Sequence, residues 1–166
     1  KLTHITLSNS FKQIGNYAFY GCSKINQITI PSSVIEIGDF VFSQCCSLTR
    51  ISIPSSVKSF GKNIFDGIKS LNITGDIIHL PNQLFEQNLS LKQIIISSSI
   101  KSIGYSSFNG CSSLIKLSIP SSVTEIGNYS FRRCSSLTKI LIPSSVISIG
   151  EFAFAGCSSL TQISIS

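Results

Sequence analysis

Charged residues are scarce in this chain, at 12% of its 166 residues, whereas hydrophobic residues make up 42%. So apolar a composition excludes a disordered chain, and so low a charge is unusual for an ordinary globular surface. Serine and asparagine must therefore supply most of the polar surface, which is typical of a short pattern copied many times. The length suffices for one domain with a substantial core.

Histidine is almost missing, since only His4 and His79 occur. A nucleophile, base and orienting group therefore have almost no candidates, and no C-x-x-C or similar Cys/His spacing indicates a metal site. No phosphate-binding G-x-x-x-x-G-K loop is found. We therefore expect a protein that is not an enzyme and that carries no cofactor.

Long apolar runs are also missing, because the longest span only a few residues, such as Ile94 to Ile96. Such runs are too short to cross a bilayer, so we expect no membrane insertion. The first residues show no basic segment followed by an apolar one, so no signal peptide is visible. The chain starts without Met inside a running pattern, and we therefore expect a fragment or a processed chain.

The sequence is instead dominated by one repeated unit, approximately L-T-x-I-x-I-P-S-S-V-x-x-I-G-x-x-A-F-x-G-C-S-S. One block of 20 residues begins at Leu71 and a partial block at Leu160, and the 23-residue blocks begin at Leu2, Ile25, Leu48, Leu91, Leu114 and Leu137. Such a period indicates a solenoid in which each block buries its apolar side chains against its neighbours. We therefore predict a single repeat domain over residues 1–166.

Each block has an opening half and a return half. The opening half alternates apolar and polar residues, which predicts a short strand whose first, fourth and sixth side chains face inward until proline ends it. In the return half, a glycine follows an inward Ile and suits either a positive φ or a close backbone approach. The return segment itself is short enough to be extended or to form one helical turn. One aromatic residue per block should stack as a buried column: Phe19, Phe42, Phe65, Phe85, Phe108, Phe131 and Phe154.

The stretches Ile119 to Phe131 (IPSSVTEIGNYSF) and Ile142 to Leu160 (IPSSVISIGEFAFAGCSSL) resemble the BspA-type leucine-rich repeats of bacterial surface proteins and parasitic protists. The resemblance covers essentially the whole chain. It implies a right-handed, curved coil with one parallel β-sheet of about seven to eight short strands. The block from Leu71 departs from the pattern, because it lacks the P-S-S turn and has Pro81 where its neighbours have glycine. The curvature there is left open.

Five of the six cysteines share one position in their blocks, Cys22, Cys45, Cys111, Cys134 and Cys157. Other blocks have Ile68 or Asn88 there, so the position behaves as a slot for a small hydrophobe, and a parallel ladder is poor geometry for bridging. We expect free buried thiols, with an occasional bridge as the alternative and Cys46 the most exposed. Free thiols favour a reducing compartment, and hence a cytoplasmic location.

The outward strand positions would form a rigid, mildly basic face. An apolar cluster of Ile95, Ile115 and Leu141 lies there beside lysines, which suits a protein partner with an acidic rim. The alternative is a solvated face of β-forming side chains. The predicted partner-binding residues are His4, Gln27, Arg50, Lys92, Gln93, Ile95, Ile115, Lys116, Lys139 and Leu141. The formal net charge is +6, but the basic residues are too sparse for specific nucleic-acid binding.

Two functions follow from the resemblance and from the habits of leucine-rich repeats. One is a scaffold or regulatory adaptor that docks a signalling enzyme such as a phosphatase. The other is a cell-surface or secreted adhesin that binds host extracellular-matrix proteins, for which the N-x-S/T triplets at Asn72, Asn88 and Asn128 are possible glycan acceptors. Because neither end has a polar capping segment, we also expect end-to-end self-association.

Overall fold

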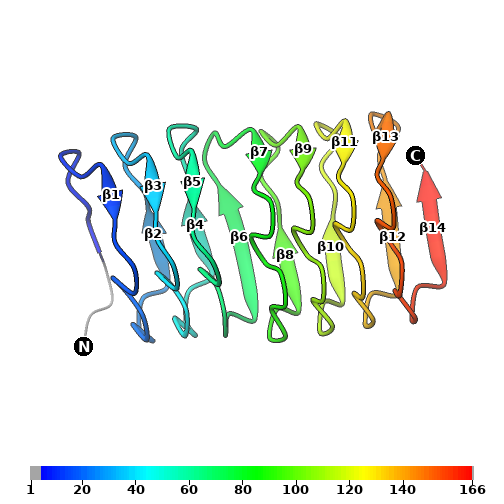
Figure 1. The fold of residues 1–166 in the computed structure, drawn as a ribbon, viewed down its shortest axis with the longest axis horizontal. Helices are drawn as coiled ribbons and strands as arrows, with labels where there is room; N and C mark the ends of the chain where they lie inside the picture. Colours follow the sequence, from blue (N-terminus) through cyan, green and yellow to red (C-terminus); the bar gives the residue numbers. More distant parts are fainter. Residues whose placement is uncertain (1–4, 166) are drawn as a thin grey trace.

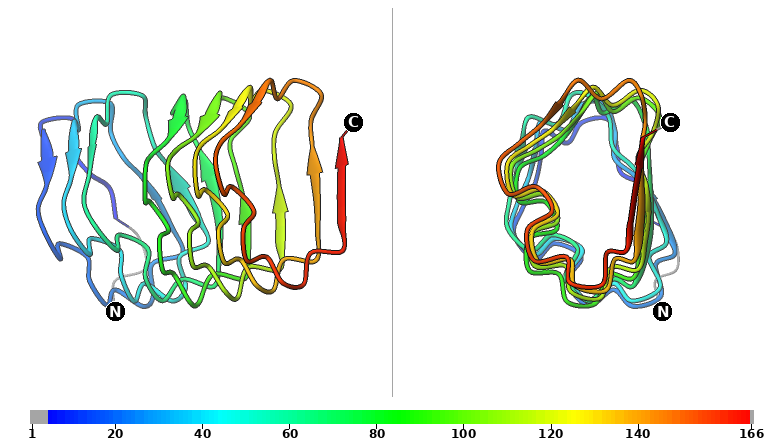
Figure 2. Two further views of the ribbon diagram at one scale, coloured as in Figure 1. Left: turned by 45° about the vertical axis from the view of Figure 1, so that its right-hand side comes forward. Right: turned by 90° about the vertical axis from the view of Figure 1, so that its right-hand side faces the viewer.

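The structure is a computed structural model that describes residues 5–165 of the chain. The described residues form a solenoid of parallel strands whose successive windings lie side by side along one axis (Figure 1). They include no helix, and so none that is long and apolar enough to cross a membrane. Each winding between residues 25 and 159 places one strand on each of two opposite walls of a flattened coil, as the view along the axis shows (Figure 2, right).

The strands of the opening halves form what we name the front wall: β2 (Gln27–Thr29), β4 (Arg50–Ser52), β6 (Ser70–Thr74), β8 (Gln93–Ile95), β10 (Lys116–Ser118), β12 (Lys139–Ile142) and β14 (Gln162–Ile165). Shorter strands of the return halves form the return wall: β1 (Gln13–Ile14), β3 (Glu36–Ile37), β5 (Ser59–Phe60), β7 (His79–Leu80), β9 (Ser102–Ile103), β11 (Glu125–Ile126) and β13 (Ser148–Ile149). Each return half is therefore extended over its two-residue strand, and the A-F-x-G-C stretch that follows forms consecutive turns, as the bond from Tyr20 N to Tyr17 O at 3.0 Å shows, without a helix.

The expectation of one parallel sheet is wrong. The front wall divides into a five-stranded sheet of order β10-β8-β6-β4-β2 and the pair β12-β14, and the return wall into β1-β3-β5 and β13-β11-β9-β7. The return halves form a ladder of their own, because the backbone N–H of the residue after the inward Ile donates to a carbonyl oxygen of the preceding winding. Gly127 N, for example, donates to Ile103 O at 2.8 Å. Successive repeats are thus joined by two ladders of strands, one on each wall.

The shortened block is accommodated by a slip of two residues in the front wall. On one side of β6, Asn72 pairs with Arg50, and on the other side Asn72 pairs with Ile95, whereas Arg50 is equivalent to Gln93. A slip by an even number keeps every side chain on its own face of the strand. Leu71 therefore stays buried at 1% exposure, and the core continues through the irregular block.

The aromatic column is confirmed. Phe42, Phe65, Phe85, Phe108 and Phe131 are fully buried, and Phe19 and Phe154 pack partly buried at the two ends of the column. Consecutive rings stack with centroids 5.2 to 6.0 Å apart. The planes of Phe65 and Phe85 are tilted by 21°, the largest angle in the column, where the irregular block begins.

The corner glycines after the first winding are explained by close approach and not by a positive φ, whereas a Cβ on Gly15 in the first winding would meet no atom within 4 Å. A Cβ on Gly104 would lie 2.6 Å from the carbonyl oxygen of Leu80, so no side chain fits there. Apart from Gly75, the described residues with a left-handed backbone instead form two other columns. The first is Tyr17, Phe40, Asn63, Gln83, Ser106, Tyr129 and Phe152; the second is Gly21, Gln44, Gly67, Gln87, Gly110, Arg133 and Gly156.

All six cysteines are free thiols, and Cys45, Cys111 and Cys134 are buried whereas Cys46 is exposed. A cysteine in this slot also forms a hydrogen bond. Its thiol donates to a phenylalanine carbonyl oxygen of the preceding winding, as Cys111 Sγ does to Phe85 O at 3.0 Å. Burial raises the pKa of Cys111 to about 12. A hydrogen bond to the side chain of Cys157 and burial both raise the pKa of the Cys134 thiol. These thiols stay protonated near neutral pH.

Candidate docking surface

The predicted partner-binding residues lie on the outer side of the front wall. Gln27, Arg50, Lys92, Lys116 and Lys139 are exposed and Gln93 is half-buried. The third strand positions lie directly beside one another in the ladder, since Gln27 pairs with Arg50, Gln93 with Lys116 and Lys139 with Gln162. His4 lies outside the described residues. The repeat therefore brings together a column of side chains that lie 23 residues apart in sequence.

The apolar cluster is exposed as expected: Ile95 by 49%, Ile115 by 54% and Leu141 by 55%. The carbonyl oxygen of Lys92 accepts hydrogen bonds from the backbone N–H of Ile115 at 2.9 Å and of Lys116 at 3.2 Å, which places these residues on adjacent windings. Leu141 and Lys139 lie on β12, which does not pair with β10. The expected continuous sheet face is thus divided at this point.

The charge is distributed asymmetrically between the two walls. The described front strands carry Arg50, Lys116 and Lys139 and no acidic residue. Glu36 and Glu125 lie on the return strands β3 and β11. The front wall therefore presents positive charge beside exposed aliphatic side chains.

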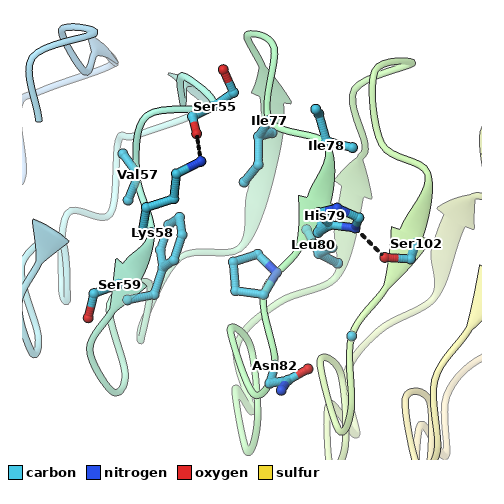
Figure 3. Close-up of a pocket in the computed structure, with 13 residues that line it drawn as sticks. Ser55, Val57, Lys58, Ser59, Ile77, Ile78, His79, Leu80, Asn82 and Ser102 are labelled. Carbon is cyan, nitrogen blue, oxygen red and sulfur yellow. Dashed lines mark hydrogen bonds between the residues drawn. The ribbon is translucent and has the colours of Figure 1, made fainter. Parts of the chain in front are cut away.

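Sequence reasoning missed a groove on the return wall, which we name the seam groove. It lies between β5 and β7, where the return sheet is interrupted, and it encloses about 650 Å³ (Figure 3). Pro81 and the missing P-S-S turn were the sequence signals for it. Its lining residues are Ser55, Val57, Lys58, Ser59, Phe60, Ile77, Ile78, His79, Leu80, Pro81, Asn82, Ser102 and Gly104.

Catalytic chemistry finds little support on either wall. His79 Nδ1 lies 2.8 Å from Ser102 Oγ, but in residues 5–165 we find no hydrogen bond that orients the second ring nitrogen. Within the same residues no group of three or more His, Cys, Asp or Glu side chains is placed to hold a metal ion.

Comparisons with known proteins agree with this architecture. The family model described as "BspA type Leucine rich repeat region (6 copies)" matches residues 1–86 and 78–166. No curated protein matches the sequence.

Three bacterial crystal structures are similar to the chain. A leucine-rich repeat protein from Bacteroides ovatus shares 27% identity at a TM-score of 0.67 and aligns with 98% of this chain and 54% of its own. A leucine rich cell surface protein from Faecalibacterium prausnitzii shares 32% identity at a TM-score of 0.54, over 85% of this chain and 32% of its own. The leucine rich repeat protein of T. pallidum shares 30% identity at a TM-score of 0.56, over 92% of this chain and 62% of its own. The chain thus spans between 32% and 62% of the length of these proteins.

Proposed function

The chain belongs to the BspA-type leucine-rich repeat family, and from this premise we propose that it is a protein-docking scaffold whose front wall holds a partner with an acidic rim. The observation that carries the proposal is the exposed set of Ile95, Ile115 and Leu141 beside basic side chains. Exposed apolar anchors with flanking charge are typical of specific interfaces. Because the front strands described above carry basic and no acidic residues, their charge is complementary to that of an acidic partner.

A charge-reversal experiment tests the docking surface. The partner is first captured from the native cell on immobilised protein and identified, and its affinity is then measured by isothermal titration calorimetry. The double variant Lys116→Glu/Lys139→Glu should bind at least about tenfold more weakly, because two attractive charges become repulsive.

The matched control is Lys62→Glu/Lys101→Glu, which makes the same charge change at exposed positions outside the front wall. Its affinity should stay within about twofold of the original protein. Equal weakening in both double variants would show that net charge and not the front wall determines binding, and an unchanged affinity in the first variant would refute the assignment.

As the first cellular role we propose a cytoplasmic regulatory adaptor that docks a signalling enzyme such as a phosphatase. The support is the set of six free thiols, which fits a reducing compartment. The phosphatase is an inference from what leucine-rich repeats commonly dock.

The second candidate is an adhesin at the cell surface that binds host extracellular-matrix proteins. It is favoured by the similarity to the F. prausnitzii protein, which is a cell surface protein. Protein isolated from the native cell distinguishes the two roles through its thiol count and its glycans. Asn128 is the acceptor to examine, because its side chain is exposed whereas Asn88 is buried. Six reduced thiols without a glycan support the adaptor, and a glycan at Asn128 supports the adhesin.

A further inference from the structure

Within residues 5–165, the windings of the return wall are joined by backbone hydrogen bonds at every boundary except one. Lys58 N donates to Ile35 O at 2.9 Å and Gly61 N to Ile37 O at 2.8 Å, which joins β5 to β3. Lys101 N likewise donates to Ile78 O at 2.7 Å on the other side of the seam groove. Between residues 57–61 and 77–82, however, no hydrogen bond is formed.

The missing bonds leave a regular set of groups free. By the pattern of the neighbouring windings, Lys58 O would accept from Ile78 N and Phe60 O from the nitrogen of residue 81. Residue 81 is proline, which has no N–H, so the second bond cannot form. The edge of β5 therefore offers two carbonyl oxygens two residues apart, and the opposite side of the groove offers the N–H of Ile78.

This arrangement matches one kind of ligand. Two acceptors at a spacing of two residues on one strand edge match two N–H groups of a second extended chain. We propose that the seam groove binds an extended segment of a partner protein, which adds as a strand to the edge of β5. This mode of recognition, β-strand addition, takes its affinity from the backbone and its specificity from alternate side chains.

The side chains around the groove indicate what the segment carries. Val57, Ile77 and Leu80 line the groove and are buried, and Ile78 is 46% exposed. Alternate side chains of an added strand would face this apolar lining. The segment is therefore apolar at every second residue.

The charge of the groove indicates an acidic side chain in the segment. Lys58 is exposed, its Nζ donates to Ser55 O at 2.7 Å near one end of the groove, and none of the lining residues is acidic (Figure 3). The nearby carboxylate of Asp76 already accepts from Ser55 N at 2.8 Å and from Ser55 Oγ at 2.9 Å. An aspartate or glutamate of the partner segment would pair with Lys58.

Fluorescence anisotropy with a labelled hexapeptide, Val-Thr-Val-Asp-Val-Thr, tests the proposal. Two further versions are N-methylated, one at the valines and one at the other three residues. A strand added to one edge donates from alternate residues only, so one methylated peptide should bind within about twofold of the parent and the other at least about tenfold more weakly. Equal binding by both, equal loss by both, or no saturable binding of the parent up to about 1 mM would each refute strand addition.

Matched protein variants locate the site. Lys58→Glu should weaken peptide binding about tenfold, whereas Lys101→Glu changes the equivalent residue at the closed boundary and should leave it within about twofold. Both variants are checked for native circular dichroism. The front-wall variant Lys116→Glu/Lys139→Glu should bind the peptide normally, so that failure of the front-wall proposal and failure of this one are distinguishable.

A second copy of the chain is the alternative occupant. Sedimentation velocity of the protein alone should therefore show no dimer that depends on Lys58. A dimer that Lys58→Glu dissociates would assign the groove to self-association and overturn the proposal, as would equal effects of Lys58→Glu and Lys101→Glu on peptide binding.

Discussion

The side-chain amide of Asn88 donates a hydrogen bond to the carbonyl oxygen of Phe65 at 2.8 Å, across the boundary that contains the seam groove. In other windings the slot thiol makes the equivalent bond, as Cys134 does to Phe108 O at 3.2 Å. Asn88 Oδ1 also accepts from the backbone N–H of Leu91 at 3.1 Å, and the residue is 4% exposed. Asn88 therefore forms a hydrogen bond between the two windings whose return strands do not pair.

Replacing this asparagine should destabilise the solenoid. Asn88→Ala leaves the N–H of Leu91 without its partner and removes one of the two donors to Phe65 O, which also accepts from Ile68 N at 3.2 Å. We therefore expect a loss of about 1–3 kcal/mol in the free energy of unfolding, measured by urea denaturation. Asn88→Cys restores a donor and should lose less than the alanine variant. A loss equal to or larger than that of alanine would contradict the role given to the hydrogen bond.

The aromatic column should carry much of the stability. Phe108 is fully buried and stacks on Phe85 and Phe131 with centroids 5.2 Å away on each side. Phe108→Ala should therefore cost about 3–5 kcal/mol in chemical denaturation. Phe152 stacks only at the surface and is 60% exposed, so Phe152→Ala is the control and should cost less than about 1 kcal/mol. Similar losses in the two variants would contradict the column as the core.

Backbone strain predicts that two substitutions at one position of the repeat change the free energy of unfolding in opposite directions. Gly110 and Arg133 occupy the same position of consecutive repeats, with φ of 77° and 58°. Gly110→Ala puts a Cβ into the left-handed region and should cost about 1–2 kcal/mol. Arg133→Gly relieves the same strain of about 1–2 kcal/mol, but glycine also loses about 0.5–1 kcal/mol more in backbone entropy on folding. The net effect should therefore be neutral or stabilising by up to about 1 kcal/mol. Thermal unfolding of both variants measures the signs, and a destabilised Arg133→Gly would disagree with this account.

The buried column was predictable because Phe42 and Phe131 recur at a fixed position, and a coil with a constant period must superimpose them. The slip at β6 was not predictable, since a shift of two residues leaves both Leu71 and Ile73 facing inward and the alternation of residues does not distinguish the two registers. The return ladder was also ambiguous, because two residues per winding are too few to show a strand period.

The front-wall residues were named correctly as outward-facing because alternation determines the face of a strand, as Ile95 and Ile115 show. The seam groove is not predicted by the sequence, although Pro81 departs from the repeat. A proline predicts that one hydrogen bond is missing, but the groove also depends on the pairing of β5 with β3 and of β7 with β9 and not with each other. That choice depends on the geometry of whole windings, which no local residue pattern specifies.

The rates at which the cysteines react with a thiol reagent should follow their exposure to solvent. Cys46 is exposed, whereas Cys45 beside it is fully buried, so a disulfide-exchange reagent such as DTNB should modify Cys46 fastest. Cys46→Ser should remove that fast phase, and the buried thiols should react only as the protein unfolds. Persistence of the fast phase in Cys46→Ser would mean that another thiol is accessible.

Alkaline pH should destabilise the protein through its buried thiols. Burial raises the pKa of Cys45 from 9.0 to about 11, and burial likewise raises that of Cys111 to about 12. Above pH 9 the unfolded chain therefore loses protons that the native state retains, so the free energy of unfolding should fall as pH rises from about 9 to 12 and stay insensitive to these thiols below pH 9.

The double variant Cys45→Val/Cys111→Val isolates this effect, because Ile68 shows that the slot accepts an aliphatic side chain. The two proteins have all their other side chains in common, so the contribution of the rest of the chain cancels in the difference between the two curves. Urea denaturation from pH 8 to pH 11 should give a steeper fall for the original protein than for the variant. Parallel curves would show that the thiols ionise equally well in the native state, and hence that the slot is open to water.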